Sequence, residues 1–231
     1  MASRKMIQLE TNASLEKTVS LTDQIYDRVR QEIIQAGWRP GSVLLEPELA
    51  VLYGVSKTPV REALRLLVQE DWVVILPRKG YLVRPLRLGD ISEVFGLRMM
   101  IEPSLIADTA RNAGAAGVAL LAQRLNEQRE AVDLQHSLDS ARDFHLASAQ
   151  FARNRRAERV LERLLDEVRR LHYLMPEVES HITSSVELEA HERIMKAIDA
   201  SKPDEAADLM RSHLAEVAQT MIDAFSVIRI D

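Results

Sequence analysis

The sequence contains no cysteine, few aromatic residues and no long apolar run. Without cysteine, the chain can form no disulfide, no thiolate zinc site and no cysteine nucleophile. No run of about 18 apolar residues occurs, so we expect no membrane span. The first twenty residues lack the apolar core that a signal peptide needs. These absences are compatible with a reducing, cytoplasmic setting.

The residues that are abundant favour helix, and the charges divide the chain in two. Only 4% of the 231 residues are aromatic, whereas the helix formers Leu, Ala, Arg and Glu recur throughout. Residues 1–87 carry 13 Lys and Arg against 10 Asp and Glu, a net charge of +3. Residues 88–231 carry 17 against 25, a net charge of −8. This asymmetry predicts two modules with different partners.

The basic part has the pattern of a winged helix-turn-helix. Apolar residues at helical spacing predict helices at 21–36, 46–53 and 57–70, and two β-type runs follow at 72–76 and 81–84. We therefore expect a flexible arm at 1–18, a winged helix-turn-helix domain at 19–85 and a linker at 86–89.

The acidic part, residues 90–231, reads as helix throughout. The predicted segments are 90–111, 115–133, 137–152, 155–174, 182–200 and 203–227. Long helices joined by short loops form antiparallel bundles. The predicted fold class is therefore mainly α, an N-terminal winged helix-turn-helix followed by a C-terminal antiparallel six-helix bundle.

The run from Tyr53 to Leu64 carries the most specific signal. A helix-turn-helix needs a tight turn, supplied by Gly54, and a second helix whose N-terminal residues face base edges. The candidate DNA contacts are Ser56, Lys57, Thr58, Arg61 and Arg65 in that helix, and Arg78, Lys79 and Gly80 in the turn between the strands. Each cation alone fits a solvated helix face, but their concentration on this motif predicts binding to double-stranded DNA.

Three histidines fall on apolar faces of different predicted helices. His145, His191 and His213 each direct an imidazole towards the interior of the bundle. Imidazole is a common ligand of zinc and nickel, and bundles build metal sites from facing helices. A hydrogen-bonded core histidine is the alternative for each position.

Arg98 also lies on an apolar stripe, and a cation directed inward needs a counter-charge. Glu102, one helical turn further on, is one candidate partner. The other is the carboxylate of a small acid, which a guanidinium matches geometrically. Both interpretations remain open from the sequence.

The front module closely resembles the GntR family of bacterial transcription regulators. The matching segments are Pro40-Gly41, Glu48-Leu49-Ala50, Val55 to Leu64 and Pro77 to Val83. The resemblance implies that Lys57, Thr58, Arg61 and Gly80 contact an operator. Two departures affect base preference: Pro47 stands where the family often has Arg, and Lys57 stands where Arg is commoner.

The back half resembles the FCD ligand domain of FadR-like members of that family, in its VanR-type branch. The markers are Arg98 with Glu102, Phe144-His145, Asn154, His191 and His213. The resemblance implies a divalent metal, Zn or Ni, on the three histidines. It also implies a hydrogen bond from Asn154 to the effector, although Asn154 could equally cap the next helix.

One position departs from the family's metal site. The family's fourth ligand, an Asp four residues before the first His, is replaced by Ala141. We expect three imidazoles with open coordination positions. Weak metal binding, and loss of the metal in favour of an anion, are the alternatives.

Together these features predict a homodimeric regulator, most often a repressor in this family, and not an enzyme. It would bind a palindromic operator and respond to a small carboxylate effector. The alternatives are an acyl-CoA-responsive regulator without metal, a constitutive DNA-architectural protein, and a metalloenzyme that uses the three histidines. No sequence motif supplies the general base that such an enzyme needs.

Overall fold

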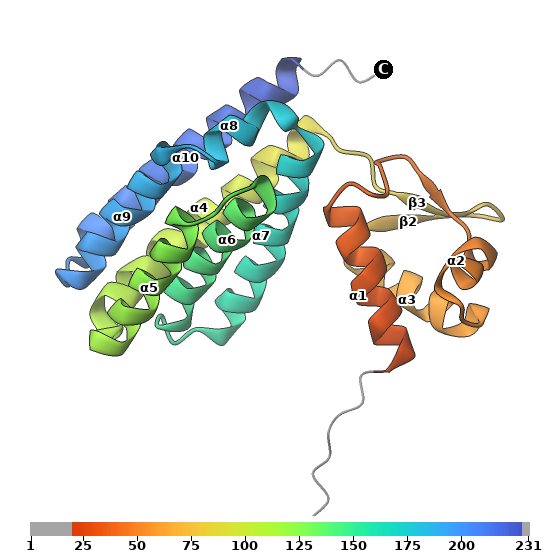
Figure 1. Cartoon of the computed structure of the whole chain (residues 1–231), viewed down its shortest axis with the longest axis horizontal. Helices are drawn as coiled ribbons and strands as arrows, with labels where there is room; N and C mark the ends of the chain where they lie inside the picture. The colour runs from red at the N-terminus through yellow and green to blue at the C-terminus, as the bar shows by residue number, and fades with distance from the viewer. Residues whose placement is uncertain (1–19, 228–231) are drawn as a thin grey trace, which may run out of the picture.

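The computed structural model describes residues 20–227, and the arm expected at 1–18 lies outside the described residues. Figure 1 shows two packed units joined by a short segment. The smaller unit, residues 20–83, is called the head, and the larger unit, residues 88–227, is called the bundle. The expected fold class, a winged helix-turn-helix followed by a helical bundle, is confirmed.

The head combines three helices with a small sheet. Its elements are α1 (Leu21–Ile34), β1 (Val43–Leu44), α2 (Glu46–Tyr53), α3 (Lys57–Gln69), β2 (Val73–Leu76) and β3 (Gly80–Val83). The apolar faces of α1 and α3 pack with the strands into one core, in which Val29, Leu64 and Val83 are fully buried. The strand β1 was not predicted; it pairs antiparallel with β3, so the sheet order is β1-β3-β2. Two residues are too few to show an alternating pattern.

The bundle contains the six predicted long helices. They are α4 (Leu88–Asn112), α5 (Gly114–Arg129), α6 (Leu134–Gln150), α7 (Arg155–Leu174), α9 (Ser185–Asp199) and α10 (Pro203–Val227). Helix α4 packs against α6, α7, α9 and α10, so it lies at the centre of the bundle.

Two short elements that the sequence did not predict precede α9. They are a 3-10 turn, Pro176–Val178, and the helix α8, Glu179–Ile182. The long helix begins only after Ser184, whose hydroxyl accepts a hydrogen bond from the Val186 amide. The predicted start at residue 182 was therefore three residues early.

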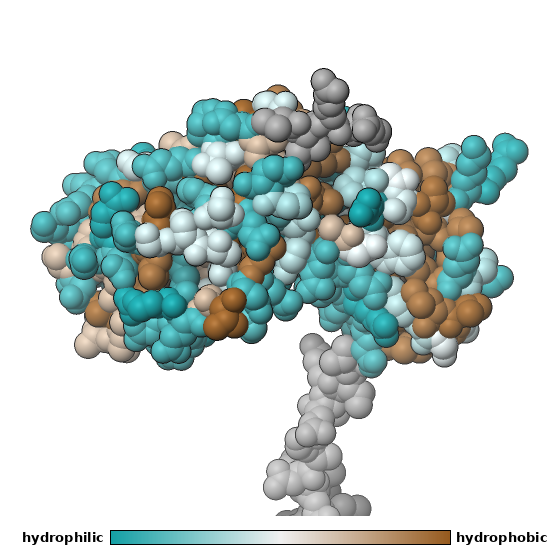
Figure 2. Space-filling model, turned by 45° about the horizontal axis from the view of Figure 1, so that its top comes forward, coloured by the Kyte–Doolittle hydropathy of each residue, from teal (hydrophilic) through white to brown (hydrophobic). Residues whose placement is uncertain are grey.

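The surface differs between the two units. In Figure 2 the largest apolar area lies over the head, whereas hydrophilic residues dominate the bundle. The exposed apolar side chains of the head include Val51, Leu52 and Ile75, with 83%, 57% and 58% of their surface exposed. Within residues 20–227, no helix is long and apolar enough to cross a membrane.

Gly80, at the start of β3, is required by the backbone of the head. Its φ is +98°, and a Cβ atom there would lie 2.5 Å from the carbonyl oxygen of Leu44. We expect Gly80→Ala to lower the free energy of unfolding of the head by more than about 1 kcal/mol, measured by urea denaturation. At Gly96, inside α4, an added Cβ atom would have no neighbour within 4 Å. Gly96→Ala should therefore raise the free energy of unfolding by up to about 1 kcal/mol. Equal effects of the two substitutions would contradict this account.

Candidate functional sites

The predicted DNA contacts lie on two exposed elements of the head. Ser56, Lys57, Thr58, Arg61 and Arg65 are exposed at or along α3, on the side away from its buried residues, and Arg78 and Lys79 are exposed in the turn before β3. Gly80 is half-buried, and the close packing of the sheet is what requires a glycine at this position.

Arg61 is held by a carboxylate that the sequence did not single out. Its Nε and Nη2 atoms lie 2.9 and 2.7 Å from Oε2 of Glu46, and the Tyr81 hydroxyl donates to Oε1 of Glu46 at 3.3 Å. Hydrogen bonds from Arg61 lower the pKa of Glu46 below its usual value. Glu46 thus connects α2, α3 and β3, and it orients the guanidinium on the exposed face of α3.

The three predicted metal ligands converge inside the bundle. His145 on α6, His191 on α9 and His213 on α10 are 4%, 0% and 4% exposed. Their ring centroids are separated by 4.9 Å (His145–His191), 4.8 Å (His191–His213) and 5.4 Å (His145–His213). Residues distant in sequence are therefore brought into one cluster.

A fourth potential ligand, Glu187, completes this cluster. Its Oε1 atom lies 3.6 Å from Nε2 of His191 and 3.8 Å from Nε2 of His213. The ligand atoms of Glu187 and the three histidines all lie within 4.8 Å of one another. Glu187 precedes His191 by one turn of α9, so its spacing is visible in the sequence, but the family's pattern directs attention to the turn before His145.

Hydrogen bonds at Nδ1 orient two of the imidazoles, and in His191 they leave Nε2 available to the cluster. Nδ1 of His191 donates to Oε1 of Gln128 at 2.8 Å, and Nδ1 of His145 lies 2.6 Å from Oε2 of Glu102. Nε2 of His191 has no hydrogen-bond partner although it is buried, and neither has Oε2 of Glu187. Such second partners commonly orient metal-binding imidazoles.

Burial keeps His191 and His213 neutral, which is the form that binds metal. Burial lowers the pKa of His213 to about 4 and holds that of His191 well below its usual value. Burial alone would raise the pKa of Glu187, but His213 and the contact with His181, whose Nε2 atom lies 3.6 Å from Oε2, lower it below its usual value. A negative oxygen among neutral nitrogens is a suitable donor set for a divalent cation.

Arg98 is engaged in the pair that the sequence offered as one alternative. Its Nε atom donates to Oε1 of Glu102 at 2.5 Å, and its Nη2 atom lies 3.4 Å from Nε2 of His145. Both side chains are at most 3% exposed. Burial alone would raise the pKa of Glu102, but Arg98 and His145 lower it to about 2.

A small cavity, which we call the histidine cavity, opens beside the cluster. Its volume is about 30 Å³, and its lining includes Ala141, Arg142, His145, Arg169, Glu187 and His213. Ala141 faces this space, as expected for the position of the missing Asp. Within residues 20–227, Asn154 is not among its lining residues; its side chain instead accepts a hydrogen bond from the Ala157 amide and caps α7.

Buried neutral histidines make the metal-free protein sensitive to acid. Burial also lowers the pKa of His172 to about 4. The unfolded chain therefore takes up protons below about pH 6.5 that the folded chain binds only near pH 4, so the free energy of unfolding should fall across this interval. We expect His172→Gln to reduce that loss by up to about 3 kcal/mol in urea titrations of chelator-treated protein. A pH profile that His172→Gln leaves unchanged would contradict this account.

Two family models match the chain. The model of the bacterial regulatory proteins of the gntR family matches residues 21–83, and the FCD domain matches residues 93–216. The HTH-type transcriptional repressor RspR of Escherichia coli (strain K12) is 26% identical over 217 residues, covering 92% of this chain and 94% of RspR. The HTH-type transcriptional regulator YdhC of Bacillus subtilis (strain 168) is 24% identical, covering 86% and 90%.

Solved structures share the fold. Escherichia coli McbR/YncC matches with a TM-score of 0.77 at 20% identity, covering 90% of this chain and 100% of that one. A GntR transcriptional regulator from Rhodococcus sp. RHA1 matches with a TM-score of 0.74 at 23% identity, covering 90% and 99%. Family models match both the head and the bundle, and the relatives named above are transcriptional regulators. The chain therefore belongs to the GntR family, as a transcriptional regulator with an FCD effector-binding domain.

Proposed function

We propose that this protein is a homodimeric repressor whose affinity for a palindromic operator is changed by a small organic acid bound beside a divalent metal. The observation that carries the proposal is the cluster of His145, His191, His213 and Glu187, buried in the unit that does not read DNA. Buried polar and charged groups are tolerated only with close partners, and a divalent cation would be such a partner for this cluster.

The residues present fit a divalent metal. Two buried atoms of the cluster, Nε2 of His191 and Oε2 of Glu187, lack hydrogen-bond partners. Three nitrogens and one carboxylate oxygen form a set that zinc accepts, and nickel is the second candidate. When bound, the cation supplies positive charge that attracts an anionic oxygen. Glu187 takes the role that the family gives to the residue at position 141.

The head supports operator binding by a dimer. Its α3 presents Lys57, Thr58 and Arg61 to solvent, as a recognition helix does. Two such heads related by a two-fold axis match the half-sites of a palindrome. Repression is the activity in the name of the relative RspR.

The cavity disfavours the acyl-CoA alternative. That alternative predicts a long apolar pocket, whereas the histidine cavity measures about 30 Å³, and its apolar walls are interrupted by the charged side chains of Arg142, Arg169 and Glu187. The guanidinium groups of Arg142 and Arg169 in this lining match the charge of an organic acid. The acid changes operator affinity only if it binds the DNA-competent and DNA-incompetent arrangements differently.

The metal ligands are tested by moving the carboxylate. Glu187→Gln should weaken zinc binding at least about tenfold, measured by competition with a chromophoric chelator. Adding Ala141→Asp should restore much of the affinity, because position 141 lines the same cavity one turn before His145. Glu189→Gln on the same helix serves as the control. Unchanged zinc affinity in Glu187→Gln would exclude Glu187 as a ligand.

Operator binding is tested with duplexes selected from a random pool by the purified protein. The selected sequences should be palindromic, with two chains per duplex. For Arg78→Ala/Lys79→Ala, the slope of log affinity against log salt should fall by about 1 for each phosphate that the variant no longer neutralises. Arg111→Ala, on an exposed part of the bundle, should leave that slope unchanged. Selection of no sequence at all would contradict the proposal.

A further inference from the structure

Asp166 on α7 is shared by arginines from both units of the protein. Its side chain is 3% exposed. Oδ2 accepts a hydrogen bond from Nη2 of Arg30, in the head, at 2.8 Å, and Oδ1 accepts from Nε of Arg142, on α6, at 2.9 Å. Nη1 of Arg169 lies 3.8 Å from Oδ1. One buried carboxylate thus holds one cation of the head and two cations that line the histidine cavity.

The histidine cavity is too small for an organic acid in this arrangement. Its volume of about 30 Å³ is enough for one or two water molecules. An acid can therefore enter only when lining side chains move. The long charged side chains of the lining are Arg98, Arg142, Arg169 and Glu187.

Arg142 and Arg169 are easier to redirect than Arg98. Moving Arg98 would leave the buried carboxylate of Glu102 without its cation, which is strongly unfavourable. Arg142 and Arg169 instead divide their contacts among several carboxylates, some of them exposed. Nη2 of Arg169 contacts Asp139 at 2.7 Å, and Arg142 also approaches Glu162 at 3.4 Å.

Arg169 has a donor group without an acceptor. Its Nε atom is buried and has no hydrogen-bond partner, although the residue is only 8% exposed. A buried donor without a partner is rare in folded proteins. A carboxylate beside Arg142 and Arg169 would supply that acceptor.

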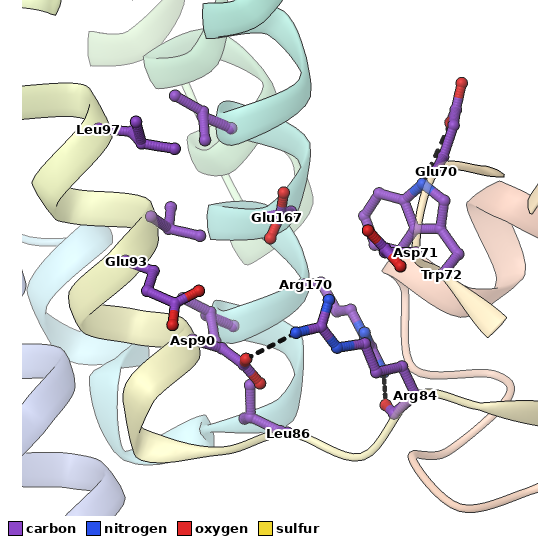
Figure 3. A pocket seen from close by; sticks show the side chains of 13 residues that line it. Glu70, Asp71, Trp72, Arg84, Leu86, Asp90, Glu93, Leu97, Glu167 and Arg170 are labelled. Atoms are coloured by element: carbon purple, nitrogen blue, oxygen red, sulfur yellow. Dashed lines mark hydrogen bonds and ion pairs between the residues drawn. The ribbon is translucent and has the colours of Figure 1, made fainter. Parts of the chain in front are cut away.

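On the head side, Arg30 belongs to the interface between the two units. Its guanidinium lies 5.3 Å from the ring centroid of Trp72, and its Nε atom lies 3.4 Å from Glu70. Figure 3 shows the adjoining part of this interface, where Arg170 donates to the carbonyl oxygen of Arg84 and Arg84 pairs with Asp90. The Arg30–Asp166 ion pair is therefore part of what holds the head against α7.

We propose that Arg142 and Arg169 receive the carboxylate of the effector, and that Asp166 transmits this event to the head through Arg30. The inference rests on the proposed function, because it names the binding residues and the route of regulation for the same effector site.

The direction of the coupling follows from charge. While Arg142 contacts Asp166, it repels Arg30 across the shared carboxylate. When Arg142 turns to the effector, that repulsion weakens and Asp166 remains buried with Arg30 as its main partner. Acid binding therefore strengthens the hold of α7 on the head, and a head held in one orientation changes its fit to two operator half-sites.

The binding residues are tested by titration calorimetry on zinc-loaded protein. The probes are carboxylic acids of two to eight carbons, from acetate and succinate to benzoate. We expect Arg142→Gln and Arg169→Gln each to weaken the tightest-binding acid about tenfold or more. Arg159→Gln, at an exposed position of α7, should bind it as the wild type does. Zinc content serves as the folding control, and Arg142→Lys, which keeps the charge, should lose less affinity than Arg142→Gln.

Two negative results have different meanings. If an acid binds the wild type and both glutamine variants equally, the assignment of Arg142 and Arg169 is overturned and the proposed function stands. If no acid of the panel binds the wild type, the proposed acid effector fails, and this inference fails with it.

The route to the head is tested with the selected operator duplex. Addition of the acid should change the operator affinity of the wild type by about fivefold or more. In Asp166→Asn and in Arg30→Gln the acid should still bind, but it should leave the operator affinity nearly unchanged. A change of wild-type size in Asp166→Asn would overturn the role of Asp166. If a bound acid leaves the operator affinity of the wild type unchanged, the proposed regulation is wrong.

Discussion

Buried negative charge has to be matched by positive charge or hydrogen-bond donors, and three carboxylates impose this condition on the bundle. Glu102, Asp166 and Glu187 are 2%, 2% and 4% exposed. An ionised carboxylate inside a protein is tolerated only with close partners. Glu102 therefore fixes Arg98 and one nitrogen of His145, Glu187 lies among imidazoles, and Asp166 collects arginines from the head and the bundle.

Each of these three carboxylates has a different role in the bundle. Glu102 contacts Nδ1 of His145, and Nε2 of the same ring lies 3.4 Å from Nη2 of Arg98. Glu187 gives the cluster its negative charge. Asp166 lies where the cavity wall meets the head, because its arginine partners come from α1 and α6. In the mechanism that we propose, the ligand site and the route to the DNA-binding unit both follow from this electrostatic requirement.

Local patterns predicted the fold and part of the cluster. Helical periodicity located the long helices, and the apolar stripes around His145, His191 and His213 correctly directed all three imidazoles inward. Glu187 was not predicted because the family's carboxylate precedes His145 by one turn, whereas helix packing supplies one from α9. The Arg30–Asp166 pair joins residues 136 positions apart, and no local pattern records such a contact. Asn154 had two possible roles in the sequence, and the structure places it at the start of α7.

The central claim is that three imidazoles and Glu187 form one metal site inside a regulator of transcription. X-ray absorption spectroscopy of the zinc-loaded protein tests it most directly, because it reports the atoms around the metal. We predict three imidazole nitrogens at about 2.0–2.1 Å and a carboxylate oxygen at about 2.0–2.2 Å. A spectrum with fewer than three imidazoles, or one that Glu187→Gln leaves unchanged, would contradict the account.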